Sequence, residues 1–193
     1  AAWLLDKKTG EDVKVVCAWT IGELLDAKGI TPLASALSDE SLKVRRSAAE
    51  ALGKIGDPKG GAPLAAAVEA LAKVFDSKMQ RNMMDLTDWE NLQDLNAVYV
   101  QALSLIGDPK TAQPVISVSI RKILCSKITV DYDRQVQDNP EIARRKAGKA
   151  ILEALPGFKE PKLKDELKGI RETFAGASDM LEAADAAEAK FGG

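Results

Sequence analysis

The chain has 193 residues, of which 46% are hydrophobic, 29% charged and 5% aromatic, and its formal net charge is −2. This balance is typical of a soluble globular protein, and no uncharged apolar run reaches the ~18 residues that a membrane-spanning helix needs. The slightly acidic charge argues against a general nucleic-acid binder, because the phosphate backbone is bound by a clustered basic surface. The sequence contains no histidine, which excludes Ser-His and Cys-His catalysis and the usual zinc and haem sites. We therefore expect no catalytic activity, no metal site and no bound cofactor.

The compartment is left open by the sequence. Ala1 is not an initiator methionine and no apolar leader segment follows it, which fits a processed mature protein, an engineered start or an excised segment. A cytoplasmic location is the default, with an exported or organellar compartment as the alternative if Ala1 is a processed N-terminus. Cys17 and Cys125 lie in different helical segments, and we expect two free, mostly buried thiols.

An internal repeat organises the chain. The segment that begins at Val13, "VKVVCAWTIGELLDAKGITPLASAL", aligns without a gap with the segment that begins at Val44, "VRRSAAEALGKIGDPKGGAPLAAAV", at an offset of 31 residues. A second alignment sets Gly56 on Gly107, and a weaker third sets "VRRSAAEAL" (44–52) on "ARRKAGKAI" (143–151). Self-similarity at a fixed period predicts a repeat architecture.

Each unit is predicted to be a pair of helices. Apolar residues between Val44 and Ile55 recur at spacings of three and four, the period of one helical face. Gly56 then suits the left-handed end of a helix, and Pro58 cannot continue its hydrogen-bond ladder. Further prolines stand where the next helices should begin, at Pro32, Pro63, Pro114 and Pro161. We expect an all-α solenoid of about four to five stacked antiparallel helix pairs, with residues 1–193 as one domain.

Large aliphatic residues mark the helix interfaces of this stack. Leu52 has the equivalents Ile21, Leu103 and Ile151 in the other units, and we expect this position to be buried.

A first insertion, at about residues 76–96, lengthens one helix pair. Its apolar residues continue the preceding helix at spacings of three and four, through Leu71, Phe75, Met79, Met83 and Leu86. A new helix is predicted to begin in a capping box of Thr87 and Glu90. We expect a projecting helical hairpin in which Met79, Met83, Met84 and Trp89 offer soft apolar surface, with extra core as the alternative for Met79 and Met83.

A second insertion, at about residues 126–138, is predicted to be an exposed loop that ends at Asn139 as cap and Pro140 as first helical residue. Its carboxylates resemble the opening of a calcium loop, but Val136 replaces the required glycine and Ile142 the closing glutamate. We therefore expect no calcium site there.

The C-terminal segment at about residues 178–191 is predicted to be a capping helix. Ser178 is a suitable N-cap, and Asp179 and Glu182 favour the positive start of the helix. Leu181, Ala184, Ala187 and Phe191 lie near one face, and Gly192 follows as a stop.

The best repeat unit, "LSDESLKVRRSAAEALGKIGDPKGGAPL" (37–64), resembles the HEAT-like repeat of the phycobilisome-lyase type. The resemblance implies a right-handed α-solenoid and no single activity. It also implies that an Asp–Arg pair, Asp39 with Arg45, links successive repeats, and Asp138 with Arg144 has the same spacing. The first and third units depart from the pattern with Lys14 and Asn96.

The repeat alignment predicts which residues face a partner. The best repeat carries a polar stripe of Arg46, Glu50 and Lys54; its equivalents are Val15, Trp19 and Glu23, then Ala97, Gln101 and Leu105, then Arg145, Lys149 and Glu153. Apolar residues interrupt this stripe in the first and third units. The residues expected to bind a partner are Val15, Trp19, Met79, Met83, Met84, Trp89, Gln101 and Leu105. For Trp19 the alternative is that the segment around Trp3 covers it.

These expectations favour a protein–protein interaction scaffold, an accessory or organising subunit of a larger assembly, with protein partners and no nucleic acid or membrane span. The resemblance leaves two alternatives: a maturation or lyase-type factor that clasps a client protein and cofactor, and a HEAT-like nucleic-acid repair module that would use Trp3, Trp19 or Trp89. If the apolar residues do not bind, the basic segment 144–149 is the next candidate surface.

Overall fold

The structure is a computed structural model that describes residues 2–6, 8–80, 85–108, 115–126, 140–158 and 160–191. Several predicted features fall outside the described residues: Met83, Met84, Pro114, Asp138, Asn139, Gly192 and nearly all of the second insertion.

The described residues form helices and contain no strand. In chain order the elements are α1 (Ala2–Leu5), α2 (Glu11–Glu23), η1 (Ala27–Gly29), α3 (Ile30–Ala36), α4 (Leu42–Ile55), η2 (Pro58–Gly60), α5 (Gly61–Gln80), α6 (Leu86–Ile106), η3 (Ser119–Leu124), α8 (Pro140–Ala154), η4 (Leu155–Phe158), η5 (Pro161–Asp165), α9 (Glu166–Thr173) and α10 (Ser178–Lys190). Residues 115–118 are also helical and lead into η3, which has π-helical geometry.

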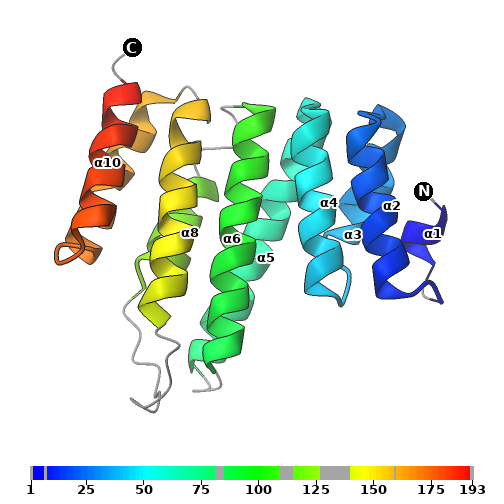
Figure 1. The fold of residues 1–193 in the computed structure, drawn as a ribbon, viewed down its shortest axis with the longest axis horizontal. Coiled ribbons are helices and arrows are strands. Elements are labelled where there is room, and N and C mark those ends of the chain that lie inside the picture. The colour runs from blue at the N-terminus through cyan, green and yellow to red at the C-terminus, as the bar shows by residue number, and fades with distance from the viewer. Residues whose placement is uncertain are drawn as a thin grey trace.

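The helices are arranged in two layers along one axis, with the termini at opposite ends (Figure 1). We name the row of α2, α4, α6, α8 and α10 the B layer; α3, α5 and α9 lie behind it. Within the B layer, α4 packs against α2 and α6, and α6 packs against α8. The predicted all-α solenoid is confirmed.

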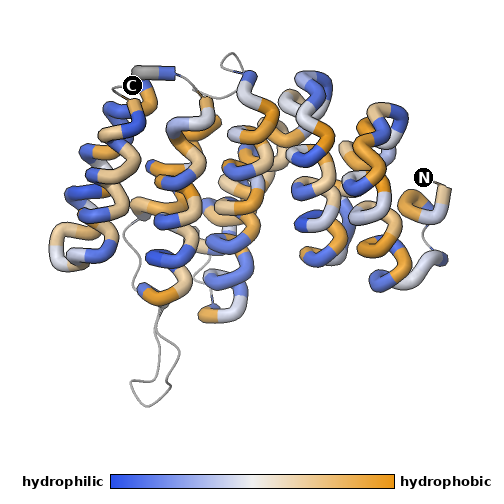
Figure 2. Tube along the Cα trace, turned by 45° about the horizontal axis from the view of Figure 1, so that its top comes forward, coloured by the Kyte–Doolittle hydropathy of each residue, from blue (hydrophilic) through white to orange (hydrophobic). Residues whose placement is uncertain are grey.

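Each helix of the B layer contains both hydrophobic and hydrophilic residues (Figure 2). The aliphatic position that the repeat units share is buried as predicted at Leu52, Leu103 and Ile151. Ile21 is half-buried, since α2 has a B-layer neighbour, α4, on one side only.

The predicted helix ends are confirmed at the repeated glycines. Gly56 and Gly107 both have a φ of +68°, the left-handed conformation that glycine adopts without steric cost. Asp57 then accepts a hydrogen bond from the Lys59 backbone N–H and starts η2 at Pro58. Pro32 and Pro63 lie in the first turns of α3 and α5, as expected.

Two predicted N-caps are wrong. The N-cap of α6 is Asp85, whose carboxylate accepts a hydrogen bond of 2.7 Å from the Asp88 backbone N–H, so the helix begins before Thr87. In α10, Ser178 is the first helical residue, and the N-cap residue Ala177 makes no side-chain cap. The C-terminal helix itself is present, and it buries Met180, Ala184 and Ala187.

Small residues set the spacing of the B layer. A Cβ atom added to Gly22 would lie 2.8 Å from the Ala51 Cα, and one added to Gly53 would lie 2.8 Å from the Ala102 Cα. These are the same contact in successive repeats. Ser104 takes the place of the glycine in the next unit, and its hydroxyl donates a hydrogen bond of 2.7 Å to the Ala154 carbonyl. Helix α6 is therefore tied to α8 by a polar contact.

Candidate functional site

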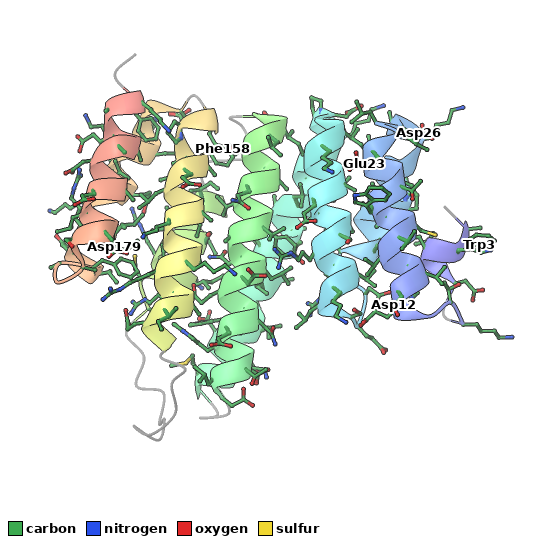
Figure 3. The ribbon with its side chains drawn as sticks, in the orientation of Figure 1. Trp3, Asp12, Glu23, Asp26, Phe158 and Asp179 are labelled. Carbon is green, nitrogen blue, oxygen red and sulfur yellow. The ribbon has the colours of Figure 1, made fainter. Side chains whose placement is uncertain are left out.

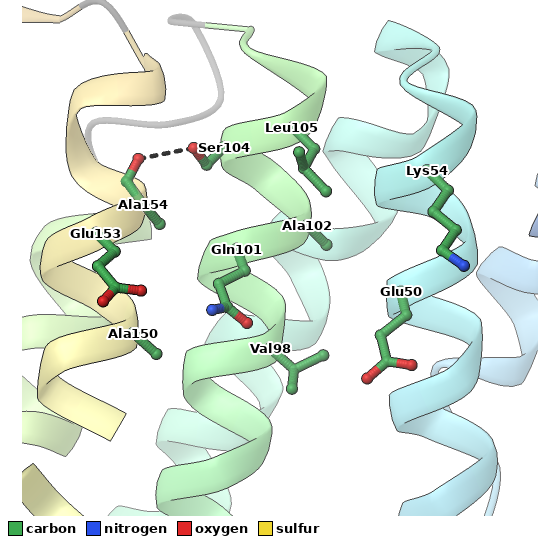
Figure 4. Close-up of a pocket in the computed structure, with 10 residues that line it drawn as sticks. All are labelled: Glu50, Lys54, Val98, Gln101, Ala102, Ser104, Leu105, Ala150, Glu153 and Ala154. Atoms are coloured by element: carbon green, nitrogen blue, oxygen red, sulfur yellow. Dashed lines mark hydrogen bonds between the residues drawn. The ribbon is translucent and has the colours of Figure 1, made fainter. Parts of the chain in front are cut away.

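A groove of about 400 Å³ opens on the B layer where α4, α6 and α8 lie side by side (Figure 4). Its apolar lining consists of Val98, Ala102 and Leu105 from α6 and Ala150 and Ala154 from α8. Its polar lining consists of Glu50, Lys54, Gln101, Ser104 and Glu153. The groove combines a floor of small and aliphatic side chains with charged residues around it.

A second hollow of about 530 Å³ continues the first along α6. It shares Val98, Gln101 and Ala150 with the groove. Towards the start of α6 its lining includes Glu90, Asn91 and Asp94, and from the facing helices Arg46, Ile142 and Lys146. We name the two together the α6 furrow.

The α6 furrow owes its apolar character to departures from the repeat pattern. Leu105 is 66% exposed, at a position where the other units have Glu23, Lys54 and Glu153. Ile142, at the start of α8, is 63% exposed. The alanines of α8 in the furrow project little beyond the backbone, so they leave the hollow open between α6 and α8.

The cations of the furrow are already paired. The Arg46 guanidinium binds Glu50, with an Nε–Oε1 distance of 3.0 Å, and also binds Asp94. Lys54 binds Glu23, which lies on the side of α2 that faces α4 (Figure 3).

Two carboxylates of the furrow, unlike these paired groups, have no partner among the described residues. Lys146 lies 3.8 Å from the second oxygen of Asp94, but Glu90 and Glu153 form no ion pair or hydrogen bond with the described residues. The surplus charge of the α6 furrow is therefore negative, and it sits at the two ends.

The described residues offer little for catalysis. No group of three or more Cys, Asp or Glu side chains among them is placed to hold a metal ion. Cys17 and Cys125 are both free thiols, and burial raises the pKa of Cys125, so that thiol stays protonated at neutral pH. None of the helices in the described ranges is both long and apolar enough to cross a membrane.

The two-layer stack and its repeated contacts can now be compared with known proteins. Residues 2–77 match the family model of HEAT repeats. The match spans α1 to α5, and it supports a HEAT-like repeat family for this solenoid. HEAT repeats generally mediate protein–protein interaction, and proteins built from them are typically scaffolds. A comparison with curated proteins found no match.

The structure brings two of the predicted partner-binding residues into the α6 furrow. These are Leu105 and Gln101, both exposed. Trp19 is 55% exposed on α2, at the position equivalent to Glu50 of the furrow. Trp3 lies at the outer N-terminal end of the stack and is itself exposed (Figure 3), so the alternative that this segment covers Trp19 is wrong. Val15 is half-buried against the core.

The predicted hairpin surface is wrong for Trp89. Its side chain is 2% exposed, and its ring centroid lies 5.7 Å from that of Phe75 at an interplanar angle of 47°. Because α6 begins at Leu86, Trp89 lies inside its first turn and faces α5. Met79 is half-buried and packs on the same core, so the alternative of extra core holds for it.

Asp39 and Arg45 do not form the predicted salt bridge, although the charge of Arg45 helps to lower the pKa of Asp39. The Lys14 ammonium takes the place of the arginine and lies 2.7 Å from the Asp39 carboxylate. Burial raises the pKa of Asp39, but hydrogen bonds from Lys14 and from the Ser41 backbone N–H outweigh it, so the pKa lies below its ordinary value. The link between the first two repeats is therefore a Lys–Asp pair, which the sequence departure at Lys14 could have indicated.

The predicted Asp138–Arg144 pair involves Asp138, which lies outside the described residues, but other contacts of Arg144 are described. Its Nε donates a hydrogen bond of 2.7 Å to the Leu124 carbonyl and its Nη2 one of 2.9 Å to the Ser126 carbonyl. The guanidinium also lies 5.2 Å from the centre of the Phe174 ring. Arg144 therefore satisfies the carbonyl groups at the end of η3.

The furrow residues that the alignment did not predict include Val98, Ala150, Glu90 and Ile142. They belong to α6 and α8, and their proximity depends on how the third and fourth units stack across the insertions. The alanines of α8 at spacings of three and four were the available signal.

Proposed function

We propose that this protein is a non-catalytic HEAT-repeat scaffold that binds a protein partner on its B layer, centred on the α6 furrow. On this proposal it is an accessory or organising subunit of a larger assembly, and residues 1–193 act as one domain. The observation that carries the proposal is Leu105, a large aliphatic side chain left 66% exposed above an alanine-lined floor.

The energetics of Leu105 favour an interface. Covering an exposed leucine side chain contributes about 1.5–3 kcal/mol, and large apolar patches on soluble proteins commonly mark interaction sites. Trp19 on the same layer would extend this surface towards the N-terminus, since tryptophan is enriched among the residues that dominate binding energy.

The nucleic-acid alternative is not favoured by the charges of this layer. The α6 furrow has its surplus carboxylates at Glu90 and Glu153, which would repel phosphates. In the basic segment 144–149, Arg145 and Lys149 both pair with Asp179. A single carboxylate of α10 therefore offsets part of this basic charge, and Arg144 and Lys146 pair with Glu141 and Asp94 instead.

The resemblance to phycobilisome-lyase-type repeats gives the other alternative, a factor that clasps a client protein and a cofactor. Such a client would also be a protein that binds to the surface of the repeats. The two versions differ in lifetime, because a structural subunit forms a stable stoichiometric complex and a maturation factor a transient one.

Photo-crosslinking tests the proposal. Photoreactive benzoylphenylalanine is placed at residue 105 in one variant and at residue 74 in another, and both are irradiated in an extract of the native source. Val74 is a matched control, because it is an exposed aliphatic residue on α5, outside the B layer. We expect a discrete crosslinked protein from position 105 alone. The same products from both positions, or none from position 105, would contradict the proposal.

A further inference from the structure

We propose that the α6 furrow takes an amphipathic helix that carries a basic residue at each end of its apolar stripe. This inference rests on the proposed function, because it names the chemistry of the partner at the same surface. It follows from the length of the furrow, from its apolar middle and from the two carboxylates at its ends.

The length of the furrow is set by α6. Glu90 and Leu105 are 15 positions apart in this helix, which at about 1.5 Å per residue corresponds to roughly 22 Å. Glu153 is level with the far end, because the neighbouring Ala154 carbonyl accepts the hydrogen bond from Ser104. The two free carboxylates therefore lie about four helical turns apart.

The lining favours a helix over an extended peptide. The groove is lined by side chains of α4, α6 and α8, mostly aliphatic at its floor, as Figure 4 shows. An extended peptide lying on Val98, Ala102 and Ala150 would leave its backbone N–H and C=O groups without partners, which is costly. A helix satisfies those groups internally and presents only side chains.

The middle of the furrow fits the apolar face of such a helix. Leu105, Val98 and Ile142 supply aliphatic surface, and the small Ala147 and Ala150 of α8 allow close approach of a second backbone. Residues at spacings of three and four on the incoming helix would meet this surface, as in other complexes where a helix lies in a groove.

The unpaired charges of the furrow then determine which residues the partner helix carries at its two ends. Arg46 and Lys54 are already paired with carboxylates, and Lys146 lies near Asp94. Glu90 and Glu153 remain for the partner. A helix with Lys or Arg at both ends complements these groups, and one with Asp or Glu there would be repelled.

A selection experiment tests this directly. The probe is a displayed library of helices of about 16 residues, roughly four turns, with a fixed leucine stripe and with the flanking positions varied among Lys, Glu, Gln and Ser. The library is selected on the wild-type protein and depleted on the Leu105→Glu variant, after circular dichroism has shown that this variant is folded. We expect enrichment of Lys at both ends. Enrichment of neutral or acidic ends, or no helix whose capture requires Leu105, would overturn the inference.

Charge-reversal variants give the second measurement, by fluorescence anisotropy with a selected helix. Glu90→Lys and Glu153→Lys should each weaken binding about 5- to 10-fold, a range expected when an exposed attraction becomes a repulsion. Glu69→Lys is the matched control, because Glu69 is exposed on α5 outside the furrow, and it should leave the affinity unchanged. Equal losses in all three variants would overturn the inference.

The two proposals can fail separately. If position 105 crosslinks to a protein but the selected helices show no preference for basic ends, only the inference about the partner's chemistry fails. If basic-ended helices bind the furrow but no protein crosslinks at position 105, the inference stands and the scaffold proposal fails.

Discussion

At the residue scale, the clearest departure from the repeat is Leu25. The offset of 31 residues sets it on Gly56, and it has the same left-handed backbone, with a φ of +50°. An L-residue with a Cβ atom in this conformation costs roughly 1–2 kcal/mol. The first unit lacks the Gly-Asp-Pro phrase, so a residue with a Cβ atom stands where the next two units have glycine.

We predict that Leu25→Gly stabilises the protein by about 0.5–1 kcal/mol, the relief of strain exceeding the entropy that glycine loses on folding. Thermal unfolding should show a rise in Tm of a few degrees. Leu24→Gly is the control: Leu24 is exposed with an ordinary φ of −77°, so it should give no gain. If the Leu25→Gly variant melts at or below the wild-type temperature, the backbone of Leu25 is not strained.

Glu166 gives the pH dependence expected of a partly buried carboxylate. Burial raises its pKa, but hydrogen bonds from Arg121 and Ser117 outweigh this and hold the pKa below its ordinary value of 4.5. The folded state therefore binds fewer protons than the unfolded state in this range. The stabilisation is complete above the ordinary pKa and is lost as the pH falls through the lowered one.

We predict that Glu166→Gln lowers the free energy of unfolding at pH 7 by about 1–3 kcal/mol, because Arg121 and Ser117 lose a charged partner. Its stability should also change less than that of wild type between about pH 5 and pH 3. Urea unfolding across this range measures both. Parallel pH curves for the two proteins would show that Glu166 does not contribute to the acid sensitivity.

At the element scale, the extension of α5 was predicted as far as Met79, but Leu86, which the same spacing assigned to that helix, is the first residue of α6. The apolar spacing through Phe75 and Met79 correctly extended α5. The capping box at Thr87 was a plausible start for α6, yet Asp85 caps the helix, and Trp89 is buried against Phe75. Local capping signals compete over two or three residues, and the packing of a large aromatic side chain decides between them.

We predict that Trp89→Ala destabilises the protein by about 3–5 kcal/mol, the cost of a large cavity in a core. Trp19→Ala should cost under about 1 kcal/mol, since Trp19 is 55% exposed. Denaturant unfolding of the two variants compares the same side chain in the two environments. Similar losses for both would mean that one of these burial assignments is wrong.

The close packing of the B layer gives another prediction. Gly53→Ala should destabilise by about 1–3 kcal/mol, because the new Cβ would meet the Ala102 backbone at 2.8 Å and push α4 from α6. Gly169→Ala is the matched control within α9, with open space around it, and it should stabilise by about 0.5–1 kcal/mol. Differential scanning calorimetry should give Tm shifts of opposite sign. A shift in the same direction would contradict the close approach.

At the scale of the whole molecule, the period of the sequence was sufficient to predict the stack. A repeat with large aliphatic residues at Leu52, Leu103 and Ile151 has one way to bury them, between neighbouring helix pairs. The furrow was only partly predictable. Leu105 and Gln101 follow from the stripe, but Glu90 and Ile142 reach the same surface only through the stacking of α6 on α8. The partners of long charged side chains, such as Lys14 for Asp39, likewise depend on that stacking.

On the scale of the assembly, we propose that the exposed apolar surface of the B layer binds a protein. The most direct measurement is isothermal titration calorimetry of the crosslinked partner, once purified, against wild type, Leu105→Glu and Val74→Glu. A charge buried in an apolar interface should weaken binding by about 10-fold or more, equivalent to about 1.4 kcal/mol. We predict this loss for Leu105→Glu and an unchanged affinity for Val74→Glu. Wild-type affinity in a folded Leu105→Glu variant would contradict it.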